Sequence, residues 1–132
     1  MGHNNEKVCP FCNIGEKINK ERIIYEDNVW IAILDGYPVT DGHTLLIPKR
    51  HCATYFDLND KESSSLFNVI KTIKVILEEK YNPQGFNIGV NCGEVSGQTI
   101  MHCHVHIIPR YDGDVENPRG GVRGVIPNRQ SY

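Results

Sequence analysis

The sequence lacks any long apolar run, and this absence excludes a membrane-spanning helix. Its longest apolar stretch is the six residues Val29–Leu34, whereas about 20 are needed to cross a bilayer. The first residues also lack the basic and apolar stretch of a secretion signal, and Glu6 stands where a myristoylation pattern requires Ser or Thr. We therefore expect a cytoplasmic protein with no membrane partner.

An excess of either charge is also missing. The 14 basic and 16 acidic residues give a net charge of −2, which provides no field to hold a nucleic-acid backbone. We expect no nucleic acid among the partners. The cysteines number five, so they cannot all pair within the chain, and a cytoplasmic setting keeps thiols reduced. Metal binding or burial is the expected reason for them.

The order of predicted elements indicates the fold class. The 132 residues suffice for one domain. Residues 22–25 and 29–34 predict a hairpin, and further strands are predicted at 43–48, 86–91 and 101–108. Asn59 and Glu62 form a helix-start signal, and apolar residues then recur at helical spacing, which predicts a helix from about residue 60 to 80. Five strands with short connections and one long helix predict an α+β fold with an antiparallel sheet.

Three histidines alternate along the last predicted strand, at positions 102, 104 and 106. On a strand they would form one row on one face, while Cys103, Val105 and Ile107 face the core. An ordinary exposed face more often carries Lys, Thr and Glu. The row indicates either a metal site or an imidazole that acts as nucleophile or acid and base. Because His102 and His106 are about 13 Å apart along a strand, one metal cannot easily bind all three.

These residues resemble the histidine triad (HIT) superfamily of nucleotide hydrolases and transferases. The resemblance spans roughly residues 9–112 and rests on the His-x-His-x-His row with Ile107 and Ile108 after it, on Gly97-Gln98 before it, and on the segment Asp41–Lys49. It implies a five-stranded antiparallel sheet with one long and one short helix. It also implies a homodimer that binds a purine nucleotide and cleaves it at the α-phosphate.

The resemblance assigns a role to each matching position. His104 matches the nucleophile that forms a covalent nucleotidyl-histidine, a role suited to neutral imidazole. His106 and His43 match positions close to the phosphate, where they offset developing charge. The expected nucleotide contacts are polar groups at the phosphate or leaving group (Gln98, Thr99, Asn91), a carboxylate at the ribose (Asp35) and apolar walls around the base (Phe11, Ile14, Leu45).

Cys9 and Cys12 form a Cys-x-x-Cys pair without the second pair of a zinc ribbon. A closed tetrahedral site needs two more ligands, and His51 and His102 are the histidines not required at the phosphate. Some bacterial HIT proteins are similar in this respect, which implies a structural zinc on Cys9, Cys12, His51 and His102. A redox role is disfavoured because the context of a redox Cys-x-x-Cys, at the start of a helix after a strand, is absent. The other three cysteines are interpreted as buried apolar residues.

After Arg110 the composition shifts to Asp, Gly, Pro and Arg. We divide the chain into an extension (residues 1–8), a HIT domain (9–112) and a tail (113–132) that is expected to lie extended. Arg119 or Arg123 could reach distal phosphates of a dinucleoside polyphosphate, and docking of the tail on a second subunit is an equal alternative.

The predicted activity is hydrolysis at the α-phosphate. The substrate classes are dinucleoside polyphosphates, such as diadenosine tetraphosphate, and nucleoside 5′-phosphoramidates. Two alternatives stay open: a phosphorylase or nucleotidyltransferase, and a nucleotide-binding regulator or zinc-containing interaction module without turnover.

Overall fold

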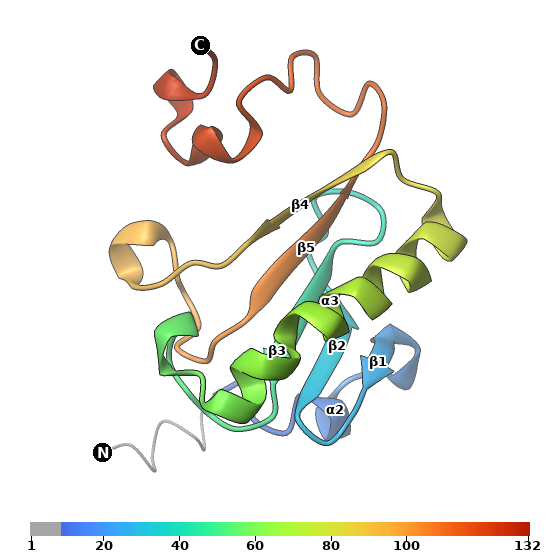
Figure 1. Ribbon diagram of the computed structural model, residues 1–132, viewed down its shortest axis with the longest axis vertical. Coiled ribbons are helices and arrows are strands. Elements are labelled where there is room, and N and C mark those ends of the chain that lie inside the picture. The colour runs from blue at the N-terminus through green and yellow to red at the C-terminus, as the bar shows by residue number, and fades with distance from the viewer. Residues whose placement is uncertain (1–8) are drawn as a thin grey trace.

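The computed structural model describes residues 9–132, and the predicted extension 1–8 lies outside these residues. Its regular elements are β1 (Ile23–Glu26), β2 (Trp30–Leu34), β3 (Thr44–Pro48), β4 (Gly85–Gly89), β5 (Val105–Arg110), a short helix α2 (Ile14–Lys17) and a long helix α3 (Asp60–Tyr81). The strands form one antiparallel sheet in the order β1-β2-β3-β5-β4 (Figure 1). The predicted α+β class, with its five-stranded sheet and two helices, is confirmed.

Alternation along β2 divides the apolar residues between two cores. Trp30 and Ala32 pack with Ile73 and Leu77 of α3, so this core lies between the helix and the sheet. Ile31 and Ile33 belong to a second cluster, which also contains Cys9, Phe11, Ile14, Leu45 and Ile47. The second cluster therefore lies on the face opposite α3.

Helix α3 begins where the sequence predicts. The Asn59 side chain accepts a hydrogen bond from the Glu62 amide, and the Glu62 carboxylate accepts one from the Asn59 amide, both at 2.8 Å. The helix ends at Tyr81, and Asn82 follows in the left-handed conformation with φ of 55°. The indole of Trp30 donates to Ser65 at 2.9 Å, which fixes the helix across the sheet.

The last strand is shorter than predicted. It begins at Val105, not at Met101, and β4 ends at Gly89, not at Asn91. The pairing of β3 with β5 stops at Leu46 opposite Val105. Two residues further along β3 lies Pro48, which has no amide hydrogen for a ladder. His102 and His104 consequently precede the strand, and only His106 lies on it.

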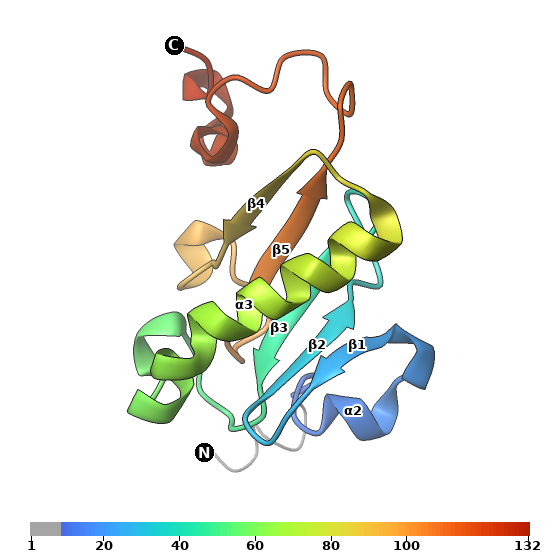
Figure 2. The same cartoon turned by 45° about the vertical axis from the view of Figure 1, so that its right-hand side comes forward.

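The prediction of an extended tail is wrong. After Tyr111 the chain turns and forms two short 3₁₀ helices, η4 (Gly121–Val125) and η5 (Pro127–Arg129), beyond the end of the sheet (Figure 2). The Arg123 guanidinium donates to the carbonyl oxygens of Arg129 and Gln130. The guanidiniums of Arg119 and Arg123 lie 4.8 and 4.7 Å from the ring centre of Tyr132. Because these contacts join residues of the tail to one another, the tail is folded on itself and not extended.

Within residues 9–132, neither helix combines the length and apolar character that a membrane span requires.

Candidate functional site

A cavity of about 720 Å³ opens on the face of the sheet opposite α3. It brings together eight of the predicted site residues, namely Phe11, Ile14, Asp35, Leu45, Asn91, Thr99, His104 and His106. Six further lining residues were missed by sequence reasoning: Arg22, Ile33, Gly36, Tyr37, Gly97 and Ile100. The alternation of β2 could have identified Ile33, which pairs with Leu45 of β3.

One wall of the cavity is apolar. Phe11 lies in the turn between Cys9 and Cys12, and Ile14 begins α2 directly after it. Ile33 and Leu45 come from the paired strands β2 and β3. Asp35 follows β2 at the cavity edge, where its carboxylate also accepts a hydrogen bond from the Tyr37 amide at 2.9 Å. The cavity therefore offers a flat apolar slot beside a carboxylate.

The ring of His104 is oriented by its own backbone. Its Nδ1 lies 2.8 Å from the His102 carbonyl oxygen, and since a carbonyl can only accept, Nδ1 donates the proton. In the neutral ring this leaves an unprotonated Nε2. The Phe11 ring packs edge-on against His104 with 5.0 Å between ring centres. His104 thus presents a lone pair while its ring is held by packing and by one hydrogen bond.

His43 and His106 form a hydrogen-bonded pair with a defined direction. The Val39 amide donates to Nδ1 of His43 at 3.1 Å, so the proton of neutral His43 is on Nε2. That nitrogen lies 2.9 Å from Nδ1 of His106 and 3.4 Å from the Asp35 carboxylate. When His43 donates to His106, the proton of His106 is on its own Nε2. His43 lies behind His106 and does not line the cavity.

Burial keeps this pair neutral. Desolvation, followed by the neighbouring His104 and His43, lowers the pKa of His106 from 6.5 to about 4, against the opposing effect of the Asp35 carboxylate. Desolvation also lowers the pKa of His43, opposed by the Asp35 carboxylate. Near pH 7 His106 therefore acts as a neutral hydrogen-bond donor.

Gln98 is not brought to the cavity with the others. Its amide nitrogen donates to the carbonyl oxygens of Ala53 and Ile100, at 2.6 and 3.0 Å, and its amide oxygen accepts from the Gly93 amide at 2.8 Å. The side chain is buried and fixes the loop that carries Thr99. Arg119 and Arg123 are also absent from the cavity lining, because both contact the folded tail.

Next to the cavity the predicted metal ligands converge. One ligand atom from each of Cys9, Cys12, His51 and His102 lies within 4.8 Å of all the others. Nδ1 of His102 is 3.4 Å from the Cys9 sulfur and 3.6 Å from the Cys12 sulfur, and Nδ1 of His51 is 3.2 Å from the Cys12 sulfur. Two thiols and two imidazoles form a donor set that suits tetrahedral zinc.

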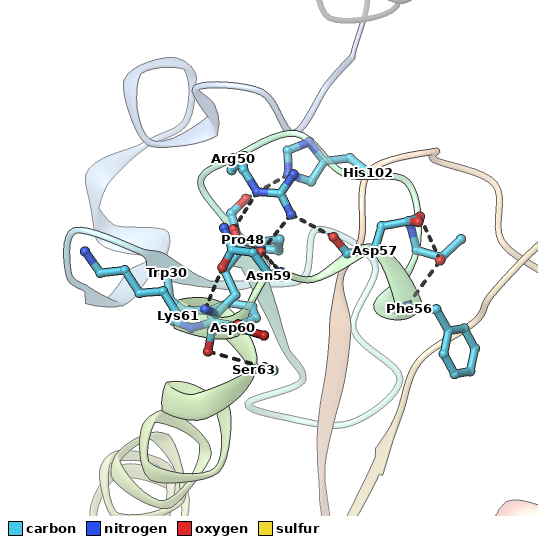
Figure 3. A network of polar contacts seen from close by, with 12 residues as sticks. Trp30, Pro48, Arg50, Phe56, Asp57, Asn59, Asp60, Lys61, Ser63 and His102 are labelled. Carbon is cyan, nitrogen blue, oxygen red and sulfur yellow. Dashed lines mark hydrogen bonds and ion pairs between the residues drawn. The ribbon is translucent and has the colours of Figure 1, made fainter.

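The surroundings of His102 fit a metal ligand. Its Nε2 donates to the Pro48 carbonyl oxygen at 2.8 Å, which leaves the Nδ1 lone pair directed at the cysteines. His51 follows Arg50, whose guanidinium binds the buried Glu62 carboxylate through two bonds and donates to the Asp57 carbonyl oxygen (Figure 3). His102 is thus held from outside the cluster by its own hydrogen bond, and the residue before His51 is anchored to α3.

A second group has residue types that can bind a metal, namely Asp35, His43 and His106. The hydrogen bonds of His43 do not suit a metal ligand. To bind a metal through Nε2, neutral His43 would need its proton on Nδ1. That nitrogen faces the Val39 amide hydrogen, so two donors would oppose each other. The group is better described as a hydrogen-bonded relay.

The remaining cysteines have no place in either site. Cys52 and Cys103 are buried, as predicted, whereas Cys92 is half-buried. Burial raises the pKa of the Cys103 thiol to about 12, so it stays protonated and unreactive.

Comparison with known proteins identifies the family of the chain. The HIT domain family matches residues 16–113. An uncharacterized HIT-like protein of Methanocaldococcus jannaschii is 41% identical over 111 residues, which cover 83% of this chain and 84% of that protein. An Arabidopsis thaliana protein named adenylylsulfatase HINT3 is 34% identical over 106 residues, 80% of this chain and 54% of that protein.

A solved structure shares the fold. The crystal structure of a zinc-bound histidine triad family protein from Mycobacterium smegmatis matches with a TM-score of 0.74 and 34% identity, and the match covers 85% of this chain and 81% of that one. The chain belongs to the HIT domain family.

Proposed function

We propose that this protein is a nucleotide hydrolase in which Nε2 of His104 attacks the α-phosphorus of a bound purine nucleotide. The observation that carries the proposal is the bond from Nδ1 of His104 to the His102 carbonyl oxygen. It leaves the nucleophilic lone pair on Nε2 in a cavity that His106 also lines. The family membership supports nucleotide binding.

The reaction has two displacements at one phosphorus. In the first, the Nε2–P bond forms and the bond from phosphorus to the leaving group breaks. Nε2–H of His106 donates to a phosphate oxygen as negative charge develops there. In the second, water attacks phosphorus, the P–N bond breaks, the proton of water is released and His104 returns to its neutral form. The sum is consumption of one water and release of a nucleoside monophosphate and the leaving group, and the proton lost by water balances the proton that the leaving group takes up.

The cavity has groups for the remainder of the nucleotide. Phe11, Ile14 and Leu45 provide apolar surface for the base, together with Ile33. The Asp35 carboxylate accepts hydrogen bonds from ribose hydroxyls, and Thr99 and Asn91 lie in the lining as polar contacts for the phosphate or leaving group. We propose adenosine phosphoramidate and diadenosine tetraphosphate as substrates. The relative named adenylylsulfatase adds adenylyl sulfate as a third substrate to test, with sulfate as its leaving group.

The first prediction concerns His104. His104→Ala should reduce release of AMP from adenosine phosphoramidate by at least about 10³-fold, because no other group replaces the nucleophile. Phe56→Ala, an exposed residue outside the cavity lining, is the control and should retain wild-type turnover. Mass spectrometry of protein quenched during turnover should find a nucleoside monophosphate on the peptide that contains His104. A wild-type protein that binds AMP and turns over none of the three substrates would be a nucleotide-binding module instead.

We also propose that the Cys9, Cys12, His51 and His102 cluster holds a structural zinc, as the donor set and the zinc-bound relative suggest. Bound there, zinc would join the turn at Cys9–Cys12 to the segment that follows β3. Elemental analysis should find close to one zinc per chain, and Cys9→Ser should lower that content. Cys92→Ser, outside the cluster, should leave it unchanged. A folded wild-type protein purified without chelators and free of zinc would contradict this assignment.

A further inference from the structure

Residues 9–14 serve both sites at once. Cys9 and Cys12 supply two of the four cluster ligands. Between them, Phe11 turns its ring into the cavity and contacts His104, and Ile14 lines the same cavity one turn later. The metal cluster and the apolar wall of the cavity are therefore built on a single stretch of chain.

Within the described residues, the backbone of this stretch makes no hydrogen bond to the sheet. It forms no strand of the sheet, and its backbone hydrogen bonds in the described chain close locally, from Ile14 to Phe11 and from Ile18 to Ile14. The Lys17 ammonium donates to the Cys9 carbonyl oxygen, again within the segment. What joins it to the sheet is apolar packing in the second core cluster and the approach of the two sulfurs to His51 and His102.

His102 is the other residue common to both sites, but it has its own anchor. Its carbonyl oxygen holds His104 and its Nδ1 faces the cysteines, while its Nε2 binds the Pro48 carbonyl oxygen of β3. That last bond is independent of the cysteines. Phe11 has no side-chain hydrogen bond, so its position depends on the turn that carries it and on its packing in the second core cluster.

We propose that metal occupancy of the Cys/His cluster and nucleotide occupancy of the cavity are thermodynamically coupled through Phe11, each raising the affinity for the other. The inference rests on the proposed nucleotide binding. When the sulfurs are fixed, the Phe11 ring is already placed against the base, so the nucleotide no longer has to order the turn. Linkage requires the reciprocal effect, tighter metal binding with nucleotide bound.

The test compares AMP binding to zinc-loaded protein and to protein stripped by a chelator, using calorimetry. We expect the zinc-loaded form to bind AMP about 5- to 150-fold more tightly, the usual range of coupling between sites. Equal AMP affinity in the two forms would overturn the coupling. If the zinc-loaded protein binds no AMP, it is the proposed function that fails.

Variants of Phe11 test whether this residue transmits the coupling between the metal cluster and the cavity. Phe11→Ala retains all four ligands, and the ratio of its AMP affinities with and without zinc should fall toward one. Phe11→Leu should restore most of the ratio, and Phe56→Ala should retain all of it. An unchanged ratio in Phe11→Ala would overturn the role of this residue.

A further experiment applies if removal of the zinc unfolds the protein. Fluorescence of Trp30, the single tryptophan, reports unfolding because this residue is buried in the core between α3 and the sheet. The rate of zinc release to a chelator is then measured on folded, loaded protein. AMP should slow release in the wild type and in Phe56→Ala, and much less in Phe11→Ala. Release that AMP does not slow in the wild type would overturn the proposal.

Discussion

At the scale of single residues, three of the five described histidines differ in the backbone group that their rings contact. A carbonyl at Nδ1 makes His104 a candidate nucleophile. An amide at Nδ1 makes His43 a donor through Nε2. A carbonyl at Nε2 makes His102 a candidate metal ligand through Nδ1. The choice of partner atom therefore determines which nitrogen is available for chemistry.

The buried state of His106 predicts a pH dependence of stability. Its pKa is about 4 in the folded chain and near 6.5 when unfolded, so the unfolded chain binds more protons between these values. The contribution of neutral His106 to the free energy of unfolding should be complete above about pH 6.5 and should be lost as the pH drops toward 4. Thermal unfolding at pH 7 and pH 5 tests this. In the His106→Asn variant, the melting temperature should change less between the two pH values than it does in the wild type. A change that is the same in His106→Asn would contradict the assignment.

Sequence reasoning predicted much of the site, because motif spacing fixes which side chains belong to it. His104, Asp35 and Thr99 were expected together, and the cavity brings them together. Spacing does not determine where a side chain turns, however. Gln98 was expected at the phosphate, and in the structure its amide is engaged by three backbone groups. Arg22, which ends the 3₁₀ helix Lys20–Arg22, and Tyr37, which lies in the loop after β2, were missed because neither segment carries a motif.

At the scale of elements, the start of α3 has an energetic consequence. Asn59→Ala removes the side-chain acceptor of the Glu62 amide and should cost about 1 kcal/mol of unfolding free energy. Urea denaturation measures this as a lower midpoint with an unchanged slope. Lys74→Ala breaks an exposed ion pair with Glu78 within the same helix and should cost no more than about 0.5 kcal/mol. Equal losses of unfolding free energy in the two variants would show that the cap stabilises the helix no more than an exposed ion pair does.

Element types were predictable where a periodic pattern was long, and boundaries were not. The helix was predicted within a residue or so because its cap and its apolar spacing agree. The strand at Val105 was predicted too long because the alternating histidines continue a strand pattern that the ladder does not follow. Whether a pattern becomes a strand depends on its partner, and here Pro48 limits the partner.

At the scale of the whole molecule, the tail makes most of its side-chain contacts within itself, and its helix η4 lies beside β4. We propose that the domain ends near residue 112 and that residues 113–132 contribute little to its stability, since the contacts of Arg119 and Arg123 lie within the tail. Truncation after Asp114, which retains the ion pair with Arg110, should shift the melting temperature by less than about 3 °C.

The same truncated chain tests the proposed homodimer. Sedimentation of the full and truncated chains at equal concentration should give a dimer for the full chain, and a loss of the dimer on truncation would place the tail at the subunit interface. A fall in melting temperature above about 8 °C in a chain whose oligomeric state is unchanged would contradict the separation of tail and domain.

The bond between His102 and Pro48 bears on the evolutionary history available to such a protein. A descendant that lost both cysteines would still hold the imidazole of His102 on β3, and with it the carbonyl that orients the neighbouring triad ring. Natural selection can thus discard the thiols while the orientation of the His104 ring is retained.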